Sequence, residues 1–491
     1  MKHLKHMLAA TLAVFLAFVL AVPAFAADTG SITINPQTGA QGTNKASYEY
    51  YELLHASIDG NKVSYYLTNG ADDDLRALLD AVTVNGSDLF TFTKSADGTR
   101  WIATINKKAD NTDYTDSDGA DIAAALNTTA IKNAALAHNT FAQNNGTAKA
   151  EGLEKGYYLV TSTLGTSLVL QTLNDVTIET KNEEYTSGKT ASKTNMNVGD
   201  LVEYTVTVNV PATANVGDVV TVHDTLDQHL DYKANTIAAV YGDSNTPVTL
   251  ADGTLKAGET FAKKFTVTSD MIGKTVKITY KAELLSTALD DNGYVNDAYA
   301  DTPTYETVPT QVEVHTFDFD LDKNFQGFAT GDDASKFSAT FELQDADGNV
   351  IKFVTDSTVP TKYTKADSTN LSSAVAVITI DQDDQVNVKG LAAGTYKLYE
   401  KTTSDGYNLL TDPIEITITD TTENGTISHT VSYKIGTEQG TGTVTVLNQS
   451  GTVLPSTGGI GTTILYVVGG ILVVGGCVAL VTKRRMASIE K

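Results

Sequence analysis

Apolar and polar residues alternate over many short stretches of this chain, and this alternation limits its fold more than any other feature. In the stretch VEYTVTVNV (202–210) every second residue is Val or Tyr, and similar patterns occur at 374–380, 415–419 and 443–448. Successive side chains of a β-strand point to opposite faces, so each pattern predicts a strand with one buried face. Turn signals such as Asp347-Gly348 separate these stretches. Short strands at this spacing predict β-sandwiches with Greek-key connections.

The N-terminal third of the chain also contains two stretches with helical spacing. Residues 72–82 and 121–143 place apolar residues three or four positions apart. They lie between predicted strands at 62–68 and 156–163. We therefore expect a mainly β fold of tandem immunoglobulin-like sandwich domains, with helices inserted in the first domain.

The first residues are typical of a secretory signal peptide. Lys2 and Lys5 precede an apolar run at 8–22, which is followed by the small-x-small site Ala24-Phe25-Ala26. The run is short and ends in a proline, which favours a cleaved signal over a membrane anchor. We expect the mature chain to begin at Ala27.

The other end of the chain contains an uncharged apolar span. Residues 460–482 are long enough to cross about 30 Å of hydrocarbon as a helix. The span is followed by Lys483, Arg484 and Arg485, which are expected to stay on the cytoplasmic side. A Gly- and Val-rich span with a basic stop favours a membrane segment over a buried core helix.

Charge and cysteine content restrict what the exported body can do. The formal net charge of the chain is −24, and a strongly acidic surface repels nucleic acid. The only cysteine, Cys477, lies in the apolar span, so the body cannot form disulfides. Any covalent cross-links in the body must therefore use other side chains.

A short motif directly before the apolar span resembles the LPxTG cell-wall sorting signal of Gram-positive surface proteins. The motif is Leu454-Pro455-Ser456-Thr457-Gly458. In that family a sortase cysteine cleaves after the threonine, here Thr457, and transfers the acyl group to an amine. The apolar span would hold the motif at the membrane, within reach of the membrane-bound transpeptidase, before being discarded.

The acceptor amine distinguishes two classes of sorted protein, a monomeric adhesin attached to peptidoglycan and a pilin joined to the next subunit. The stretch LNDVTIETKN (173–182) resembles the pilin motif of backbone pilins. The resemblance assigns Lys181 of the next subunit as the acceptor of Thr457. The aromatic-proline pair of the motif is replaced here by Glu179-Thr180. An exposed lysine at a strand end is the competing interpretation.

Two further groups of residues resemble the Lys–Asn isopeptide sites of the same family. In the last domain a Cna-B-like pattern assigns Lys323 and Asn448 as the joined residues, with Glu400 of an E-box-like segment (396–408) as the acid. The proline of the family's E-box is missing.

In the middle domain the resemblance to fimbrial pilins assigns Lys189, Asp224 and Asn296. Lys193 competes with Lys189, because strand register cannot be fixed from the sequence. The first domain contains no comparable trio, and we predict no cross-link there.

The cross-link chemistry requires these residue types. A lysine amine attacks an amide only when it is neutral, and burial disfavours the ammonium form. A buried carboxylic acid can polarise the amide carbonyl and carry a proton while ammonia leaves. A plain buried salt bridge is the alternative interpretation of each pair. The reaction would occur once per site, so we do not expect an enzyme.

The sequence therefore predicts a sortase-assembled major (backbone) pilin subunit, secreted and anchored to the Gram-positive cell wall as a surface pilus. The alternative is a monomeric wall-anchored adhesin that binds host matrix or glycan. The resemblance implies a pilin-class (class C) sortase, further copies of the chain, tip and base pilins, and peptidoglycan attachment by a housekeeping sortase as partners. A host receptor is possible, whereas nucleic acid is not expected as a partner. The aspartate clusters at 114–121 and 344–349 fail the EF-hand order, so we expect no metal and no cofactor.

These features divide the chain into seven segments. They are a signal peptide (1–26), an N-terminal domain with helical insertions (27–182), a middle isopeptide-forming sandwich (183–311), a C-terminal Cna-B-like sandwich (312–450), the sorting motif region (451–459), the transmembrane segment (460–482) and a basic tail (483–491).

Overall fold

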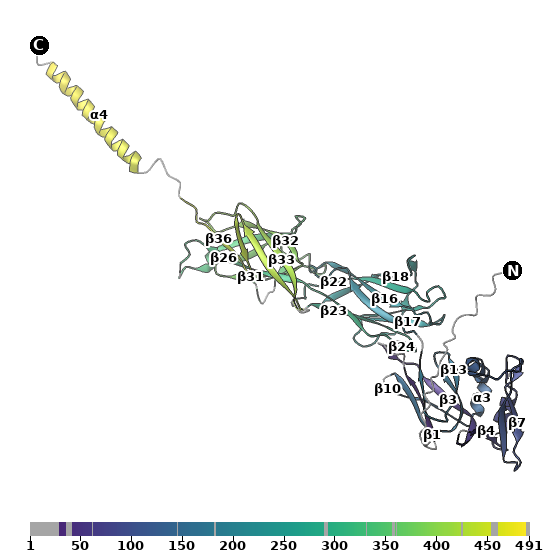
Figure 1. Cartoon of the computed structure of the whole chain (residues 1–491). Helices are drawn as coiled ribbons and strands as arrows, with labels where there is room; N and C mark the ends of the chain where they lie inside the picture. Colours follow the sequence, from purple (N-terminus) through teal and green to yellow (C-terminus); the bar gives the residue numbers. More distant parts are fainter. Residues whose placement is uncertain are drawn as a thin grey trace, which may run out of the picture.

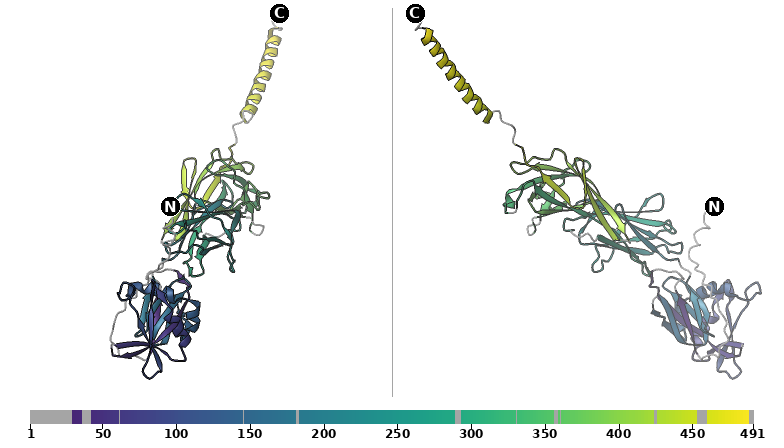
Figure 2. Two further views of the ribbon diagram at one scale, coloured as in Figure 1. Left: turned by 90° about the vertical axis from the view of Figure 1, so that its right-hand side faces the viewer. Right: turned by 60° about the vertical axis from the view of Figure 1, so that its left-hand side comes forward.

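The computed structural model shows three β-domains in an elongated row, followed along the chain by one long helix (Figures 1 and 2). It describes residues 29–35, 42–60, 62–144, 146–180, 183–288, 293–329, 331–355, 359, 361–423, 426–452 and 460–487. The signal peptide (1–26) lies outside the described residues. The expected fold class, tandem β-sandwiches with helices in the first domain, is confirmed.

The N-terminal domain packs two large sheets, a two-stranded β5-β6 sheet and three short α-helices. One sheet has the order β10-β11-β1-β14 and the other β13-β12-β3-β4-β8-β7, with β9 pairing with β3. The elements are β1 (Thr29–Asn35), β3 (Tyr48–Asp59), β4 (Lys62–Thr68), α1 (Asp73–Asp80), β5 (Thr83–Val84), β6 (Ser87–Asp88), β7 (Phe90–Lys94), β8 (Arg100–Ile105), η1 (Asp116–Asp118), α2 (Gly119–Leu126), α3 (Thr129–Ala134), β9 (Ala137–Thr140), β10 (Ala142–Asn144), β11 (Thr147–Glu154), β12 (Gly156–Ser162), β13 (Ser167–Gln171) and β14 (Val176–Glu179).

The helical prediction for 121–143 is wrong in its second half. The helix is interrupted at Thr128, whose hydroxyl accepts a hydrogen bond from the Ile131 amide and starts α3. Ala135 then takes an extended conformation, and the next residues pair as β9 with the edge of β3. Pairing to an existing sheet outweighs the local helical spacing here.

The middle domain is a sandwich of two sheets. Their orders are β15-β16-β22-β18-β19 and β2-β24-β23-β17-β21-β20, with β25 pairing with β23. The strands are β2 (Thr43–Asn44), β15 (Thr186–Ala191), β16 (Leu201–Asn209), β17 (Val219–Leu226), β18 (Leu230–Tyr241), β19 (Thr246–Pro247), β20 (Ala251–Asp252), β21 (Phe261–Thr266), β22 (Thr275–Leu284), β23 (Tyr294–Asp301), β24 (Tyr305–Glu306) and β25 (Thr310–Val314). Its last strand, β25, ends at Val314.

The C-terminal domain is a second sandwich, in which the first and last strands are neighbours. Its sheets have the orders β28-β29-β31-β26-β36 and β30-β27-β32-β33-β34-β35, and β26 pairs with β36 in parallel. The elements are β26 (Phe317–Phe325), η2 (Ala334–Lys336), β27 (Ser338–Gln344), β28 (Phe353–Thr355), β29 (Lys362–Lys365), β30 (Ile378–Asp381), β31 (Gln385–Leu391), β32 (Gly394–Thr402), β33 (Ile414–Glu423), β34 (Thr426–Ile435), β35 (Glu438–Thr441) and β36 (Val444–Asn448).

Alternation explains the cores of these sandwiches. In β16 the apolar side chains of every second residue are fully buried in the middle-domain core, while their neighbours face outward. In β26 the same alternation buries Phe319, Leu321 and also Lys323. A lysine thus occupies a core position of a strand that is otherwise apolar on that face.

The middle and C-terminal domains share a hydrogen-bonded interface. The Glu283 carboxylate accepts hydrogen bonds from the amide and hydroxyl of Ser368, at 2.8 and 2.7 Å. The Val198 amide donates to the Gly390 carbonyl at 2.9 Å. These hydrogen bonds hold the two sandwiches together in addition to the covalent linker between them.

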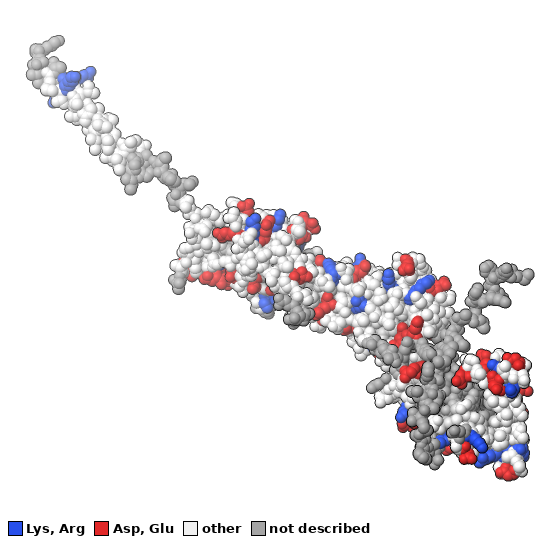
Figure 3. All heavy atoms as spheres, viewed as in Figure 1, with Lys and Arg blue, Asp and Glu red and all other residues white. Residues whose placement is uncertain are grey.

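The C-terminal helix α4 (Ile460–Ala487) is long and apolar enough to cross a membrane. Its candidate span, Thr463–Met486, has a mean hydropathy of 2.6, and none of its most apolar window is buried against the rest of the chain. On the face shown in Figure 3, acidic side chains are spread over all three domains, whereas α4 is uncharged until its C-terminal Lys and Arg residues.

Candidate cross-link sites

The structure brings Lys189, Asp224 and Asn296 together inside the middle domain. Nζ of Lys189 lies 2.6 Å from Oδ2 of Asp224 and 2.6 Å from Oδ1 of Asn296. The side chains of Lys189 and Asp224 are completely buried, and Asn296 is 0% exposed. An amine, an acid and an amide are therefore in direct contact in the absence of solvent.

Strand register places these three side chains. Lys189 lies on β15 opposite Val206 of β16, whose side chain belongs to the domain core. Asp224 on β17 and Asn296 on β23 come from two paired strands of the facing sheet. The cluster thus joins one sheet of the sandwich to the other.

The register places Lys189 and Lys193 in different surroundings. Lys193 lies beyond the end of β15, with a side chain that is 36% exposed, and its Nζ pairs with Asp200 at 2.9 Å. Only Lys189 of the two contacts Asp224 and Asn296.

Sequence reasoning missed a fourth member of the cluster, Tyr280 on β22. Its hydroxyl donates to Oδ2 of Asp224 at 2.7 Å and accepts from Nδ2 of Asn296 at 2.8 Å, and Nζ of Lys189 lies 3.0 Å away. The alternation in KITYKAEL (277–284) predicts an inward tyrosine, but nothing in it indicates which polar groups that tyrosine meets.

Burial controls the charge state of this cluster. It lowers the pKa of Lys189 to about 8, although the Asp224 carboxylate acts in the opposite direction. Burial also raises the pKa of Asp224, against the influence of Lys189 and the Tyr280 hydroxyl. Both shifts favour a neutral amine beside a neutral acid.

The C-terminal site is assembled differently. Lys323 on β26 and Asn448 on β36 come from neighbouring parallel strands, and Glu400 on β32 comes from the facing sheet. Nδ2 of Asn448 donates to Oε2 of Glu400 at 3.0 Å. Lys323 and Asn448 are each 1% exposed.

The amine of Lys323 does not yet contact the amide of Asn448. Its Nζ donates to the main-chain carbonyl of Asn324 at 2.8 Å and lies 3.6 Å from the ring centre of Phe325. Burial lowers the pKa of Lys323 to about 8, while the nearby Glu400 carboxylate opposes this shift. A change of side-chain rotamer would be needed to bring the amine to the amide.

The polymerisation residues lie outside the described part of the chain. Lys181 follows β14, an edge strand of the N-terminal domain that pairs in parallel with β1. Leu454, Pro455, Ser456, Thr457 and Gly458 directly precede α4. The roles assigned to these residues therefore remain predictions from the sequence.

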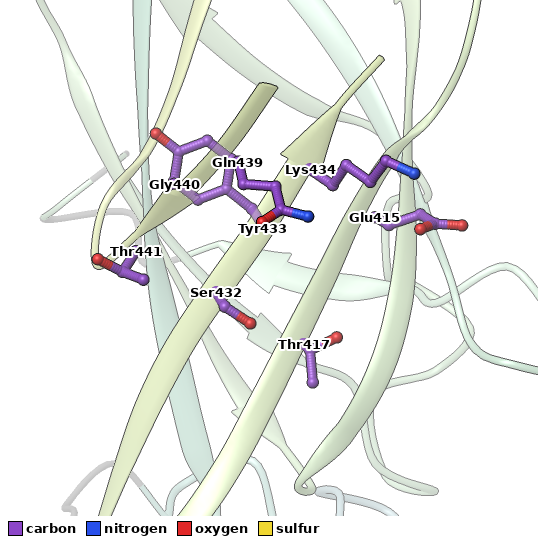
Figure 4. Close-up of a pocket in the computed structure, with 8 residues that line it drawn as sticks. All are labelled: Glu415, Thr417, Ser432, Tyr433, Lys434, Gln439, Gly440 and Thr441. Atoms are coloured by element: carbon purple, nitrogen blue, oxygen red, sulfur yellow. The ribbon is translucent and has the colours of Figure 1, made fainter. Parts of the chain in front are cut away.

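The β30-β27-β32-β33-β34-β35 sheet of the C-terminal domain contains a polar pocket with a volume of about 380 Å³ (Figure 4). It is lined by side chains of β33, β34 and β35, among them Glu415, Ser432 and Gln439. None of the cross-link residues lines it. His223, beside Asp224 in sequence, is also separate from the cluster, because its ring stacks on Tyr299 and its Nδ1 contacts Glu259 at 2.8 Å.

Two segments of the chain match known families in sequence. Residues 337–433 match the SpaA family, described as a prealbumin-like fold domain, and residues 447–488 match the LPXTG cell wall anchor motif. No curated protein matches the chain.

Several solved structures are similar to the chain at low identity. The Corynebacterium diphtheriae major pilin SpaA is 15% identical, with 86% of this chain and 100% of that chain covered and a TM-score of 0.46. The T6 backbone pilin of Streptococcus pyogenes serotype M6 is 14% identical, with 87% of this chain and 100% of that chain covered and a TM-score of 0.45. The group B streptococcus pilus 2b backbone protein is 24% identical, with 55% and 100% covered and a TM-score of 0.38.

The anchor match and α4 together show how the chain is held at the cell surface. The matched segment contains the sorting motif, the apolar helix and the basic residues that follow it. This is the arrangement of a protein anchored to the cell wall.

Proposed function

We propose that this cell-wall-anchored protein is the backbone subunit of a covalent surface fibre. The observation that carries the proposal is the pair of buried lysine–acid–asparagine groups in two successive domains of an elongated chain that ends in a sorting anchor. A chain that must transmit tension benefits from covalent bonds within each domain, and this body has no cysteine to form them.

The middle-domain group supports an amide bond between Lys189 and Asn296. A neutral amine held 2.6 Å from the amide oxygen is close to the amide carbon that it would attack. Asp224 contacts the same amine, and as a neutral acid it can give up its own proton and take the one that the attack releases. The product would be one amide bond and one molecule of ammonia.

The C-terminal group supports a second bond, between Lys323 and Asn448. Glu400 already contacts the amide nitrogen that would leave, and the two reacting residues lie on adjacent strands. Each reaction would occur once, with the domain as both catalyst and substrate, so the protein is not an enzyme in the usual sense.

Polymerisation would use a separate pair of residues. A class C sortase would cleave after Thr457 and transfer its acyl group to Lys181 of the next subunit. Tip and base pilins would complete the fibre, and a housekeeping sortase would attach it to peptidoglycan. The anchor match supports the sortase as a partner, because the cleavage site precedes a helix that is long and apolar enough to cross a membrane.

The assembly proposal is tested by a lysine substitution in cells that produce the fibre. Lys181→Ala should abolish the high-mass ladder that boiled, detergent-treated cell-wall extracts give on a gel, because the acceptor amine is gone. Lys149→Ala is the matched control, since Lys149 is an exposed lysine of β11 in the sheet that carries β14. Its ladder should equal that of the wild type.

The opposite results are equally informative. An intact ladder in the Lys181→Ala variant would show that another lysine is the acceptor. A single band from wild-type walls would identify a monomeric wall-anchored protein, the adhesin alternative.

A further inference from the structure

The Tyr280 hydroxyl touches every reacting group of the middle-domain cluster. It lies 3.0 Å from Nζ of Lys189, 2.7 Å from Oδ2 of Asp224 and 2.8 Å from Nδ2 of Asn296. The amide nitrogen of Asn296 donates to this hydroxyl and makes no hydrogen bond to Asp224 in the described structure. The acid and the leaving nitrogen are therefore connected through the tyrosine.

We propose that Tyr280 is a catalytic residue of the Lys189–Asn296 cross-link, which relays a proton from Asp224 to the departing nitrogen. The inference rests on the proposed isopeptide chemistry and assigns a role that neither motif nor resemblance indicates.

The relay balances the reaction. Nζ of neutral Lys189 attacks Cγ of Asn296, and a proton released from Nζ passes to Oδ2 of Asp224, 2.6 Å away. Once Nζ has added to Cγ, Nδ2 carries a basic lone pair, so both hydrogen bonds of the Tyr280 hydroxyl reverse. Asp224 then gives a proton to the Tyr280 oxygen while the Tyr280 hydroxyl gives its own proton to Nδ2. The Cγ–Nδ2 bond then breaks and ammonia leaves. Asp224 and Tyr280 both end in the protonation state in which they began.

The hydroxyl suits a relay because it remains neutral. Burial, with Asp224 nearby, raises the pKa of Tyr280 far above its ordinary value. A phenolate is therefore inaccessible as an isolated state, and the tyrosine can pass a proton only by accepting another at the same time.

The C-terminal site provides an internal comparison. There Nδ2 of Asn448 donates directly to Oε2 of Glu400 at 3.0 Å, so the acid reaches the leaving nitrogen without an intermediate group. The relay is thus a requirement of the middle domain alone. A substitution at Tyr280 should leave the C-terminal bond unchanged.

Intact-mass spectrometry of the exported chain tests the proposal. Each bond removes about 17 Da as ammonia, so wild-type protein should show two deficits. Tyr280→Phe should lose the middle-domain deficit, or acquire it at least about tenfold more slowly, and should retain the C-terminal one. Peptide mapping should find Lys189 and Asn296 unjoined.

Tyr232→Phe is the matched control. The Tyr232 ring packs edge-on against Tyr280 at 5.6 Å, and its buried hydroxyl has no hydrogen-bond partner among the described residues. Its removal takes a hydroxyl from the same aromatic cluster without touching a reacting group. Tyr232→Phe should show both deficits at the wild-type rate.

Folding and chemistry are separated by two further measurements. Amide exchange in β16 and β22 of Tyr280→Phe should match that of the folded but unlinked Asn296→Ala. Replacing Tyr280 by a difluorotyrosine keeps the ring and the hydroxyl but makes the hydroxyl more acidic. The rate of Lys189–Asn296 bond formation should then change at least twofold. An unchanged rate would indicate that Tyr280 has a purely structural role.

The outcomes distinguish this inference from the proposed function. Wild-type protein without any deficit would overturn the cross-link chemistry itself. Wild-type and Tyr280→Phe proteins that acquire both deficits at equal rates would overturn only the role of Tyr280.

Discussion

A single buried lysine determines much of the chemistry at each site, yet the two lysines differ in what surrounds them. Lys189 is held by Asp224, Asn296 and Tyr280. Nζ of Lys323 instead rests over Phe325, and among the described residues its hydrogen bond is to the main-chain carbonyl of Asn324. The pKa of an unlinked Lys323 should therefore report the effect of burial on an amine. The titration of Lys189 is instead coupled to that of Asp224, so its pKa does not report burial alone.

The stability of an unlinked C-terminal domain should depend on this amine. In Asn448→Ala the bond cannot form, and the folded pKa of Lys323, about 8, lies below the ordinary value of 10.5. Between these values the unfolded chain binds the proton and the folded chain does not, so stability should increase as pH rises. From pH 7 to 9.5 the free energy of unfolding should increase by roughly 1 to 2 kcal/mol. Hydrogen exchange of β26 and β36 amides would measure this change in the free energy of unfolding.

A second variant isolates the contribution of Lys323. The double substitution Lys323→Met, Asn448→Ala removes the amine but keeps an apolar side chain of similar length. The increase in the free energy of unfolding from pH 7 to 9.5 that is due to Lys323 should therefore disappear. Equal pH profiles for the two proteins would show that the buried amine is not the titrating group.

At the scale of elements, strand alternation predicts most of the fold but not how the strands are paired. The buried faces of β16 and β26 follow directly from the sequence. The parallel pairing of β26 with β36, and the facing-sheet positions of Asp224 and Glu400, depend on contacts between residues far apart in the chain. Alternation also cannot show that Tyr280 meets Asn296, because it gives the face of a residue and not its neighbours.

The same distinction applies to the residues that the sequence left open. Lys189 and Lys193 are both near the start of the middle domain, and only the pairing of Lys189 with Val206 makes it the inward one. The helical stretch at 121–143 fails in its second half because the edge of β3 offers hydrogen bonds to β9. In both cases the pairing of strands distant in sequence determines the observed structure.

Gly390 lies at a close contact between the middle and C-terminal domains. Gly390 has a φ of +82°, and a Cβ there would lie 2.8 Å from a methyl group of Val198. Gly390→Ala should therefore both strain the backbone and push the domains apart. We expect faster exchange of the Val198 amide, which donates to Gly390 across the interface, with a loss of about 1 to 3 kcal/mol.

Gly348→Ala separates backbone strain from crowding. Gly348 has a nearly equal φ, +86°, but nothing within 4 Å of its Cβ position. This control should strain its own turn and leave Val198 exchange unchanged. Similar exchange at Val198 in both variants would mean that the contact with Gly390 does not hold the domains together.

At the scale of the whole molecule, the two proposed bonds lie along the path that tension would follow. With Lys181 as the proposed acceptor, force enters the chain after the N-terminal domain and leaves at Thr457. The N-terminal domain is then outside the path, which gives a physical reason for the prediction that it has no cross-link. The bonds at 189–296 and 323–448 would close loops of 108 and 126 residues within the loaded part.

Pulling experiments on single molecules test this load path. Held through residue 181 and Ser450, wild-type protein should show no long unfolding step, because tension bypasses both loops through covalent bonds. Between the loops only the 26 residues at 297–322 can extend, by at most about 90 Å. Asn448→Ala should add one step of about 400 Å, since 126 residues extend by about 3.4 Å each. Without the bond, the parallel strands β26 and β36 are pulled in opposite directions, so their hydrogen bonds resist in shear and should break together. Held instead through Thr29, wild-type protein should show one step from the 152 residues at 29–180. A long step from the wild type held at residue 181 would place an unlinked domain in the path of the force.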